Sequence, residues 1–159
     1  MSKRKKHDLQ WIKTTLDLNE NHNWQSQPGT RIFVAGRGAV RFDVPADWHF
    51  APQENSFQFL DKKPPDDDCR LEVSYNLLPV ANWADFPIAP LLKKIVRDDS
   101  RNLGEVGEII QLKRQTARVV WTEMPFIDPQ EHRPALSRIA IGLGSEVQCL
   151  ITFDYWEDD

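Results

Sequence analysis

Short segments in which apolar and polar residues alternate recur along most of this chain, and this alternation limits its fold more than any other feature. In one of them Val40, Phe42 and Val44 share a side, while Arg41 and Asp43 share the other. A period of two is the pattern of a β-strand that buries one face. Similar segments predict further strands over residues 31–35, 56–59, 69–75, 105–114, 117–124, 135–143 and 147–155.

One segment has the period of a helix instead. From Ile88 to Val96 the apolar residues fall at i, i+3, i+4, i+7 and i+8, which places them on one face of an α-helix. We expect this helix to end near Asn102 and Gly104. The order of three or four strands, one helix and four strands predicts the α+β class, with an antiparallel β-sheet and one main helix packed on one face.

The length of 159 residues suits one domain with one hydrophobic core. Because the strand patterns begin after residue 29, we divide the chain into an N-terminal arm, residues 1–27, and a single domain, residues 28–159. The arm is basic and polar, and its apolar residues between positions 9 and 16 have the spacing of a short helix. In the domain, the last four strands are expected to form an antiparallel meander.

The charge of the chain is uneven. Four of the twenty basic residues lie at the start of the chain: Lys3, Arg4, Lys5 and Lys6. Without them, sixteen basic and 24 acidic residues would give a net charge of −8, compared with −4 for the whole chain. An acidic body repels nucleic acid and anionic membranes, so we expect neither as a partner. The basic residues at the start are followed by Asp8 and not by the apolar run of a signal peptide. No apolar stretch approaches the roughly 18 residues that are needed to span a membrane. We therefore expect a cytoplasmic protein.

The residues that could carry chemistry do not form a recognisable site. The histidines at positions 7, 22, 49 and 132 are scattered without the spacing of metal ligands. The consecutive acids 66–68 lack the alternating positions of a calcium loop, and Ser145 lies between two strands and not before a helix. Cys69 and Cys149 lie far apart and are expected to be reduced. We expect a non-enzymatic protein with no catalytic residue, metal or cofactor.

Glu123 is the carboxylate whose position leaves two interpretations open. The alternation along residues 119–124 does not decide which side of that strand is buried. On the solvent side Glu123 is an ordinary surface acid. On a partly buried side its pKa would rise, and the carboxylate could act as an acid or a base.

Aromatic residues in predicted loops are the better functional lead. Trp24 precedes the first strand, Trp48 follows a turn, and Trp83 and Phe86 lie in a proline-rich crossover before the helix. Loop aromatics held by proline can anchor a partner at low entropic cost. They can equally cover the edges of a sheet.

The run from Ala39 to Trp48 is similar to the opening of PsbP-like domains, in which a strand ends in the phrase F-x-x-P-x-x-W, here Phe42, Pro45 and Trp48. The similarity covers residues 31–156, and the chain also resembles uncharacterised cyanobacterial proteins of this kind. The resemblance implies a curved sheet flanked by helices that is used for binding and not for catalysis. Such domains usually close with a C-terminal helix, for which this sequence shows no pattern.

The sequence thus predicts a cytoplasmic protein-binding or assembly-accessory domain that uses an open sheet face and the loop aromatics. The alternative is a small-ligand binder or an enzyme, with a pocket between helix and sheet that involves Glu123 or the acidic loop. A third hypothesis is oligomerisation through the last strand, residues 147–155, if that strand forms an uncovered edge.

Overall fold

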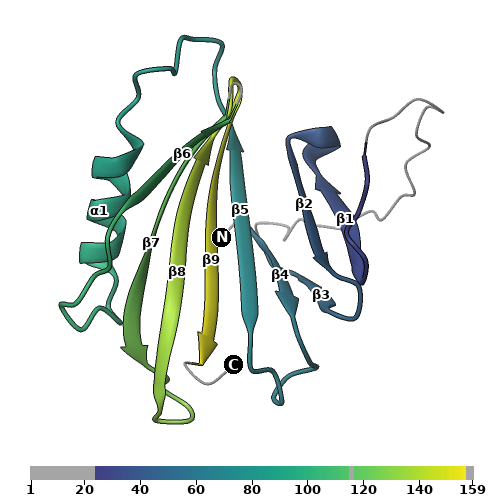
Figure 1. The fold of residues 1–159 in the computed structure, drawn as a ribbon, viewed down its shortest axis with the longest axis vertical. Helices are drawn as coiled ribbons and strands as arrows, with labels where there is room; N and C mark the ends of the chain where they lie inside the picture. Colours follow the sequence, from purple (N-terminus) through teal and green to yellow (C-terminus); the bar gives the residue numbers. More distant parts are fainter. Residues whose placement is uncertain (1–23, 115–116, 157–159) are drawn as a thin grey trace, which may run out of the picture.

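Nine strands, one α-helix and one 3₁₀ turn make up the part of the chain that this computed structural model describes, residues 24–114 and 117–156 (Figure 1). The helix, α1, spans Ile88–Asp98, and the 3₁₀ turn, η1, spans Gly36–Gly38. The strands are β1 (Thr30–Ala35), β2 (Val40–Pro45), β3 (His49–Pro52), β4 (Phe57–Leu60), β5 (Arg70–Leu77), β6 (Ile110–Arg114), β7 (Ala117–Ile127), β8 (Pro134–Leu143) and β9 (Val147–Trp156).

Seven of these strands form one antiparallel sheet in the order β3-β4-β5-β9-β8-β7-β6, and β1 and β2 pair separately as a two-stranded sheet. The expected meander of the last four strands is confirmed, because β6, β7, β8 and β9 are consecutive neighbours. The last strand, however, pairs with both β5 and β8 from Gln148 to Asp154, so it is not an edge. The hypothesis of oligomerisation through an uncovered last strand is therefore wrong.

The α+β class expected from the sequence is also wrong. Strands make up 49% of the described residues and helical segments 11%, so the fold is mostly β. Two features of the fold account for the larger share of strands. The hairpin of β1 and β2 leaves the main sheet and packs as a second β layer, and a strand that the sequence pattern did not indicate, β3, extends the sheet beyond β4. A helix of eleven residues covers only part of one face.

One half of the sheet is covered by α1. The helix buries Ile88, Leu92 and Val96 against side chains of β7 and β8, among them Met124 and Ile139. These residues are the apolar stripe that the sequence period indicated, and the helix ends where Asn102 Nδ2 donates to the carbonyl of Val96 at 2.9 Å. The predicted helix is confirmed.

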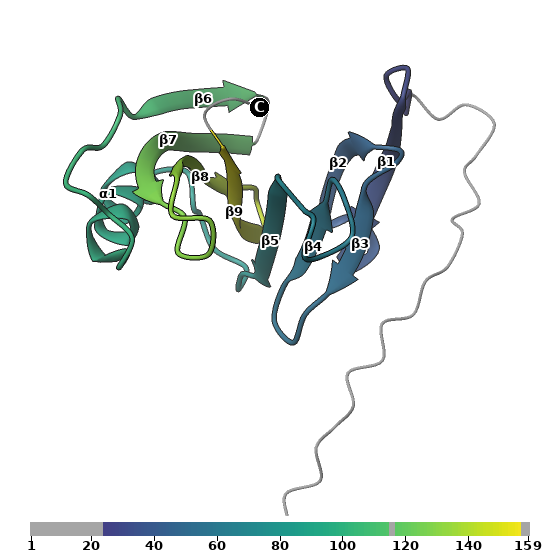
Figure 2. The ribbon, with the colours of Figure 1, turned by 90° about the horizontal axis from the view of Figure 1, so that it is seen from below.

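The other half is covered on the opposite face by the β1–β2 hairpin, as Figure 2 shows. Val44 and Phe59 are fully buried there, and Phe33 of β1 packs edge-on against Phe59 with ring centroids 4.9 Å apart. Each cover therefore protects one half of one face, and the two covers lie on opposite sides of the sheet. Half of each face has no cover among the described residues.

The turn of the β1–β2 hairpin requires glycine. Gly36 has a φ of +59°, and a Cβ atom there would lie 2.7 Å from the hydroxyl oxygen of Tyr75 on β5. A side chain would both strain the backbone and collide with the sheet. The two predicted strands on either side of Gly36 and Gly38 pair as this hairpin.

Candidate functional site

Two of the four aromatic residues singled out in the sequence lie near the β1–β2 hairpin. Trp24 is half-buried, and the guanidinium of Arg41 lies 4.6 Å from the centre of its ring. Trp48 is also half-buried and stacks on Phe153 of β9, with ring centroids 6.1 Å apart. Trp48 thus covers the main sheet beside the hairpin, while the arm before residue 24 lies outside the described residues.

The other two lie together before α1. Trp83 and Phe86 meet edge to face with centroids 5.5 Å apart, and both pack against the core under the helix. The indole Nε1 of Trp83 donates to the carbonyl of Pro79 at 3.0 Å. All four predicted aromatics are therefore held by contacts within the chain, and their role in partner binding stays a prediction.

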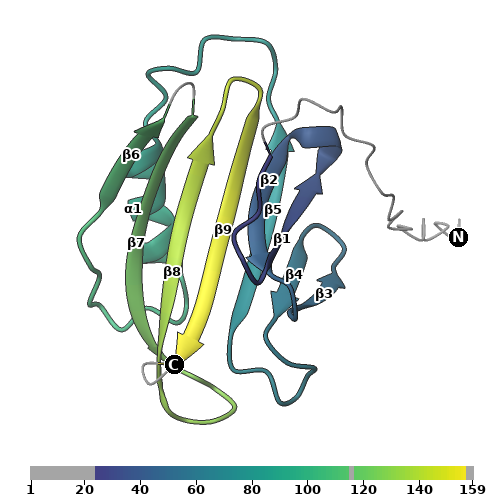
Figure 3. The ribbon, with the colours of Figure 1, turned by 45° about the vertical axis from the view of Figure 1, so that its right-hand side comes forward.

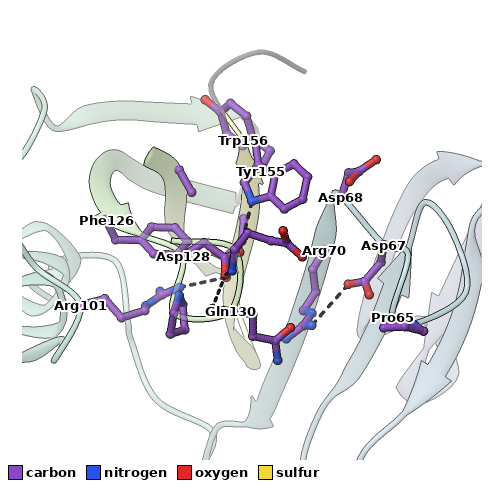
Figure 4. Close-up of a pocket in the computed structure, with 14 residues that line it drawn as sticks. Pro65, Asp67, Asp68, Arg70, Arg101, Phe126, Asp128, Gln130, Tyr155 and Trp156 are labelled. Atoms are coloured by element: carbon purple, nitrogen blue, oxygen red, sulfur yellow. Dashed lines mark hydrogen bonds and ion pairs between the residues drawn. The ribbon is translucent and has the colours of Figure 1, made fainter. Parts of the chain in front are cut away.

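A polar cavity of about 250 Å³ opens at the end of the sheet where β9 finishes (Figure 4). Its walls come from the β4–β5 loop, the β7–β8 loop, the segment after α1, and the last residues of β9. We call it the arginine pocket, after Arg70 and Arg101. Its acidic lining residues are Asp67, Asp68, Asp128, Glu131 and Asp154.

Arg101 joins three elements at this pocket. Its guanidinium donates to Asp99 at 3.1 Å, to Asp154 at 2.9 Å and to Ser137 at 3.3 Å, and it lies over the ring of Phe126. Burial alone would raise the pKa of Asp99, but the hydrogen bonds and charge of Arg101 outweigh burial and lower it. The bonds of Arg101 fasten the end of α1 to β8 and β9.

Asp128 has a similar structural role in the β7–β8 loop. Its carboxylate accepts from the backbone N–H groups of Gln130 and Glu131 and from the indole of Trp156. Burial raises the pKa of Asp128, and these donors more than reverse that effect, so the pKa is lowered. The polar groups of the arginine pocket mostly satisfy one another. Arg101, Asp128 and Asp154 are bonded within the chain, so they hold the loops that meet here.

No metal centre is found in the described residues, where no three histidine, cysteine or acidic side chains lie in an arrangement that could hold an ion. Within the same residues Cys69 and Cys149 form no disulfide bond, and burial raises the pKa of Cys149. Two acids of the predicted acidic loop, Asp67 and Asp68, pair with Arg70 and Lys62. The single described α-helix is eleven residues long, and no helix in this part of the chain is long and apolar enough to cross a membrane.

The half-face of β6, β7 and β8 that points away from α1 is a second candidate surface, which we call the open face. Figure 3 views the sheet with α1 behind these strands. Along β7 the buried residues Val120, Thr122 and Met124 point toward the helix, so Trp121 and Glu123 point to the open face. From β6 the open face receives Ile110, Leu112 and Arg114; from β8 it receives Leu136, Arg138 and Ala140.

Glu123 is therefore not in a pocket between helix and sheet. On the open face it pairs with Arg138 and accepts a hydrogen bond from the hydroxyl of Tyr155 at 3.1 Å. Arg138 also lies 4.6 Å from the centre of the Trp121 ring. Burial and the neighbouring carboxylate raise the pKa of Tyr155, which keeps its proton for this bond. The arrangement is a paired polar cluster beside a half-buried indole, so the alternative of a pocket between helix and sheet that involves Glu123 does not fit the position of this residue.

The two edges of the sheet differ. At one edge β3 has four residues and ends in Pro52, whose ring removes a backbone donor, so this edge is short and blunted. At the other edge all five residues of β6 are exposed, including Ile110 and Leu112, which are 37% and 56% exposed. Sequence reasoning missed this edge, although it predicted the strand, because strand order is not visible in a pattern of alternation.

Comparison with known proteins gives a family and a fold. A model of the Alr1449 family matches residues 31–159. A protein of Nostoc sp. (strain PCC 7120), named uncharacterized protein alr1449, is 64% identical over 159 residues and is matched over 99% of this chain and 83% of its own length. Neither match links the chain to PsbP-like domains, so that resemblance stays a prediction.

Two solved structures have a similar fold at low identity. One from Bacteroides thetaiotaomicron VPI-5482 superposes with a TM-score of 0.56 and 19% identity over 81% of this chain, which spans 42% of that structure's length. At this identity the likeness concerns the fold alone. The protein PA94 of Pseudomonas aeruginosa, of unknown function, matches 82% of this chain with 13% identity and a TM-score of 0.47.

Proposed function

The chain belongs to the Alr1449 family, and we propose that it is a non-enzymatic, cytoplasmic binding domain that takes up an extended segment of a partner protein along β6. The observation that carries the proposal is the exposed edge of β6 next to the open face. One side of the β6 backbone has no strand partner among the described residues. Such an edge is a template for an added strand, and the added backbone hydrogen bonds supply affinity.

The side chains around this edge define the chemistry of the partner. Ile110 and Leu112 present apolar surface on the open face, and Trp121 of β7 lies opposite Ile110 in the strand register. Arg114, on the same face, is exposed and has no carboxylate partner in the described part of the chain. A segment that alternates apolar residues toward this face and carries an acidic residue near Arg114 would complement it.

A display library of ten-residue peptides selected on the purified chain tests the proposal. We expect the enriched peptides to alternate apolar residues, to carry an acid, and to shift the backbone amide signals of β6 in NMR spectra. Leu112→Glu should weaken their binding by about tenfold or more, because it places a charge on the apolar face. Gln111→Glu is the matched control, since its side chain points to the other face of the same strand.

Two results contradict the proposal. One is a set of enriched peptides that binds the Leu112→Glu variant as tightly as the wild-type chain. The other is a dimer in light scattering that Leu112→Glu dissociates, which would assign the β6 edge to a second copy of the chain. The partner would then not be a different protein.

A further inference from the structure

A second pocket lies at the opposite end of the sheet from the arginine pocket, and Trp83 forms one of its walls. It has a volume of about 280 Å³. We call it the tryptophan pocket. Its lining comes from the crossover before α1, from β6 and β7 where they meet, and from the β8–β9 turn; the polar and charged lining residues are Asn82, Lys113, Arg118 and Ser145.

The charge of this pocket is opposite to that of the chain. The net charge of the chain is −4, yet Lys113 and Arg118 line the pocket and no carboxylate does. Asp85 and Glu146 are close in sequence to lining residues, but neither side chain is part of the lining. Within the described residues, neither Lys113 nor Arg118 forms an ion pair. Two cations without counter-ions in an acidic protein produce a local positive potential that favours an anion.

Arg118 is held in place without being neutralised. Its Nη2 atom donates to the carbonyl of Trp83 at 2.8 Å and to that of Phe86 at 3.0 Å. These bonds fix the guanidinium while its charge stays uncompensated, and its other N–H groups have no acceptor among the described residues. A positioned guanidinium of this kind suits a carboxylate or phosphate oxygen.

Further donors and an apolar wall complete the site. The side-chain oxygen of Asn82 accepts from the backbone N–H of Ala84 at 3.0 Å, which leaves its amide N–H₂ group as a donor. The hydroxyl of Ser145 has no partner in the described part of the chain. Trp83 is fixed by its bond to Pro79 and by the edge-to-face contact with Phe86, so its ring is a rigid apolar wall.

We propose that the tryptophan pocket binds a small organic anion, with its carboxylate or phosphate group held by Lys113 and Arg118 and its apolar part against Trp83. The volume of about 280 Å³ is close to the lower end of the roughly 300–1,000 Å³ typical of ligand pockets, so the ligand must be small. The site is separate from the partner surface proposed above. The side chain of Lys113 points to the α1 face of β6, while Leu112 and Arg114 point to the open face.

The test uses the full chain labelled with ¹⁵N and follows the indole N–H signal of Trp83, identified as the signal that Trp83→Phe removes. Benzoate and phenyl phosphate are the anionic probes, and benzyl alcohol and benzylamine are neutral and cationic probes of similar size. We expect the two anions to shift the Trp83 signal in a saturable way and the other two probes to leave it unchanged. The tighter of the two anions identifies the preferred group.

Lys113→Gln tests whether the positive charge of the pocket contributes to binding, because Lys113 is exposed and its loss breaks no described contact. The substitution should weaken binding of the anions by about fivefold, and raising the salt concentration should weaken binding to the wild-type chain in the same direction. Lys93→Gln, on the exposed side of α1, is the matched control and should bind as the wild-type chain does. Benzylamine that shifts Trp83 as strongly as benzoate does would overturn the proposal, as would unchanged affinity in Lys113→Gln.

Discussion

Arg101 shows how single side chains hold this fold together. It lies after α1 and reaches Asp99, Asp154 and Ser137, so one guanidinium connects the end of the helix with two strands of the sheet. Ser137 is fully buried and donates to Asp154 at 2.5 Å. Removing the arginine would leave Asp99 and Asp154 without their charged partner, while Ser137 would keep its bond to Asp154.

Replacing this arginine should lower stability and change its dependence on pH. Arg101→Met should reduce the free energy of unfolding at pH 7 by about 1–3 kcal/mol. The loss should lie near the smaller value, because the side chain is partly exposed to solvent. Since the pKa of Asp99 is lowered in the folded chain, its contribution is present above the unfolded pKa of about 3.9 and is lost as the pH falls through the folded value. Urea unfolding at several pH values between about 7 and 3 measures both effects.

When the pH falls below about 4, the free energy of unfolding should decrease less for the variant than for the wild-type chain, because the substitution has already removed the contribution of Asp99. Arg97→Met is the control, since Arg97 is an exposed arginine of α1 whose described ion pair is with the adjacent Asp98. Equal unfolding curves for the two variants would contradict the structural role of Arg101.

At the scale of elements, α1 and the β1–β2 hairpin act as two separate covers. The helix contributes an apolar stripe to the core above β7 and β8, while the hairpin contributes phenylalanines to a different core above β4 and β5. Neither cover reaches the other half of the sheet. The stability of the helical half should therefore depend on a few fully buried side chains of α1.

Leu92 is the centre of that contact, with no exposed surface. Leu92→Ala should lower the free energy of unfolding by about 2–5 kcal/mol, because it leaves a cavity between helix and sheet. Leu112→Ala, at a residue that is 56% exposed, should cost less than about 0.5 kcal/mol. Chemical denaturation of both variants makes the comparison, and similar losses would show that α1 does not form the core described above.

At the scale of the whole molecule, the sheet has a protected centre and unequal edges. β5, β9 and β8 each have strand partners on both sides, whereas β6 and β3 have one. Backbone amides in paired central strands exchange with solvent only through large-scale unfolding, and those at open edges exchange through local fraying.

Hydrogen exchange followed by NMR should therefore rank the strands. Amides of β9 should exchange slowest and those of β6 among the fastest, although the two strands belong to the same meander. In the presence of a peptide selected as described above, the amides of β6 should become slower while those of β3 stay unchanged. Protection of β3 in place of β6 would contradict the assignment of the open edge.

Local patterns in the sequence determined much of the secondary structure. The alternation around Val40 and Phe42 and the helical spacing from Ile88 to Val96 each depend on near neighbours, so they predicted this strand and the helix correctly. The predicted strand over 105–114 was too long, because only Ile110–Arg114 pairs with β7. The predicted strand over 117–124 was too short, because β7 continues through Pro125, which lies opposite Leu136 in the register, to Ile127.

Only the tertiary structure decided which strands are neighbours and which faces are covered. That β9 lies between β5 and β8, that β6 is the open edge, and that Glu123 points away from α1 all depend on pairings between residues far apart in the chain. Alternation defines two sides of a strand but does not say which side is buried or what lies beside it. For the same reason the sequence identified Trp83 but not Lys113 and Arg118, which strand pairing and the crossover bring to the same pocket.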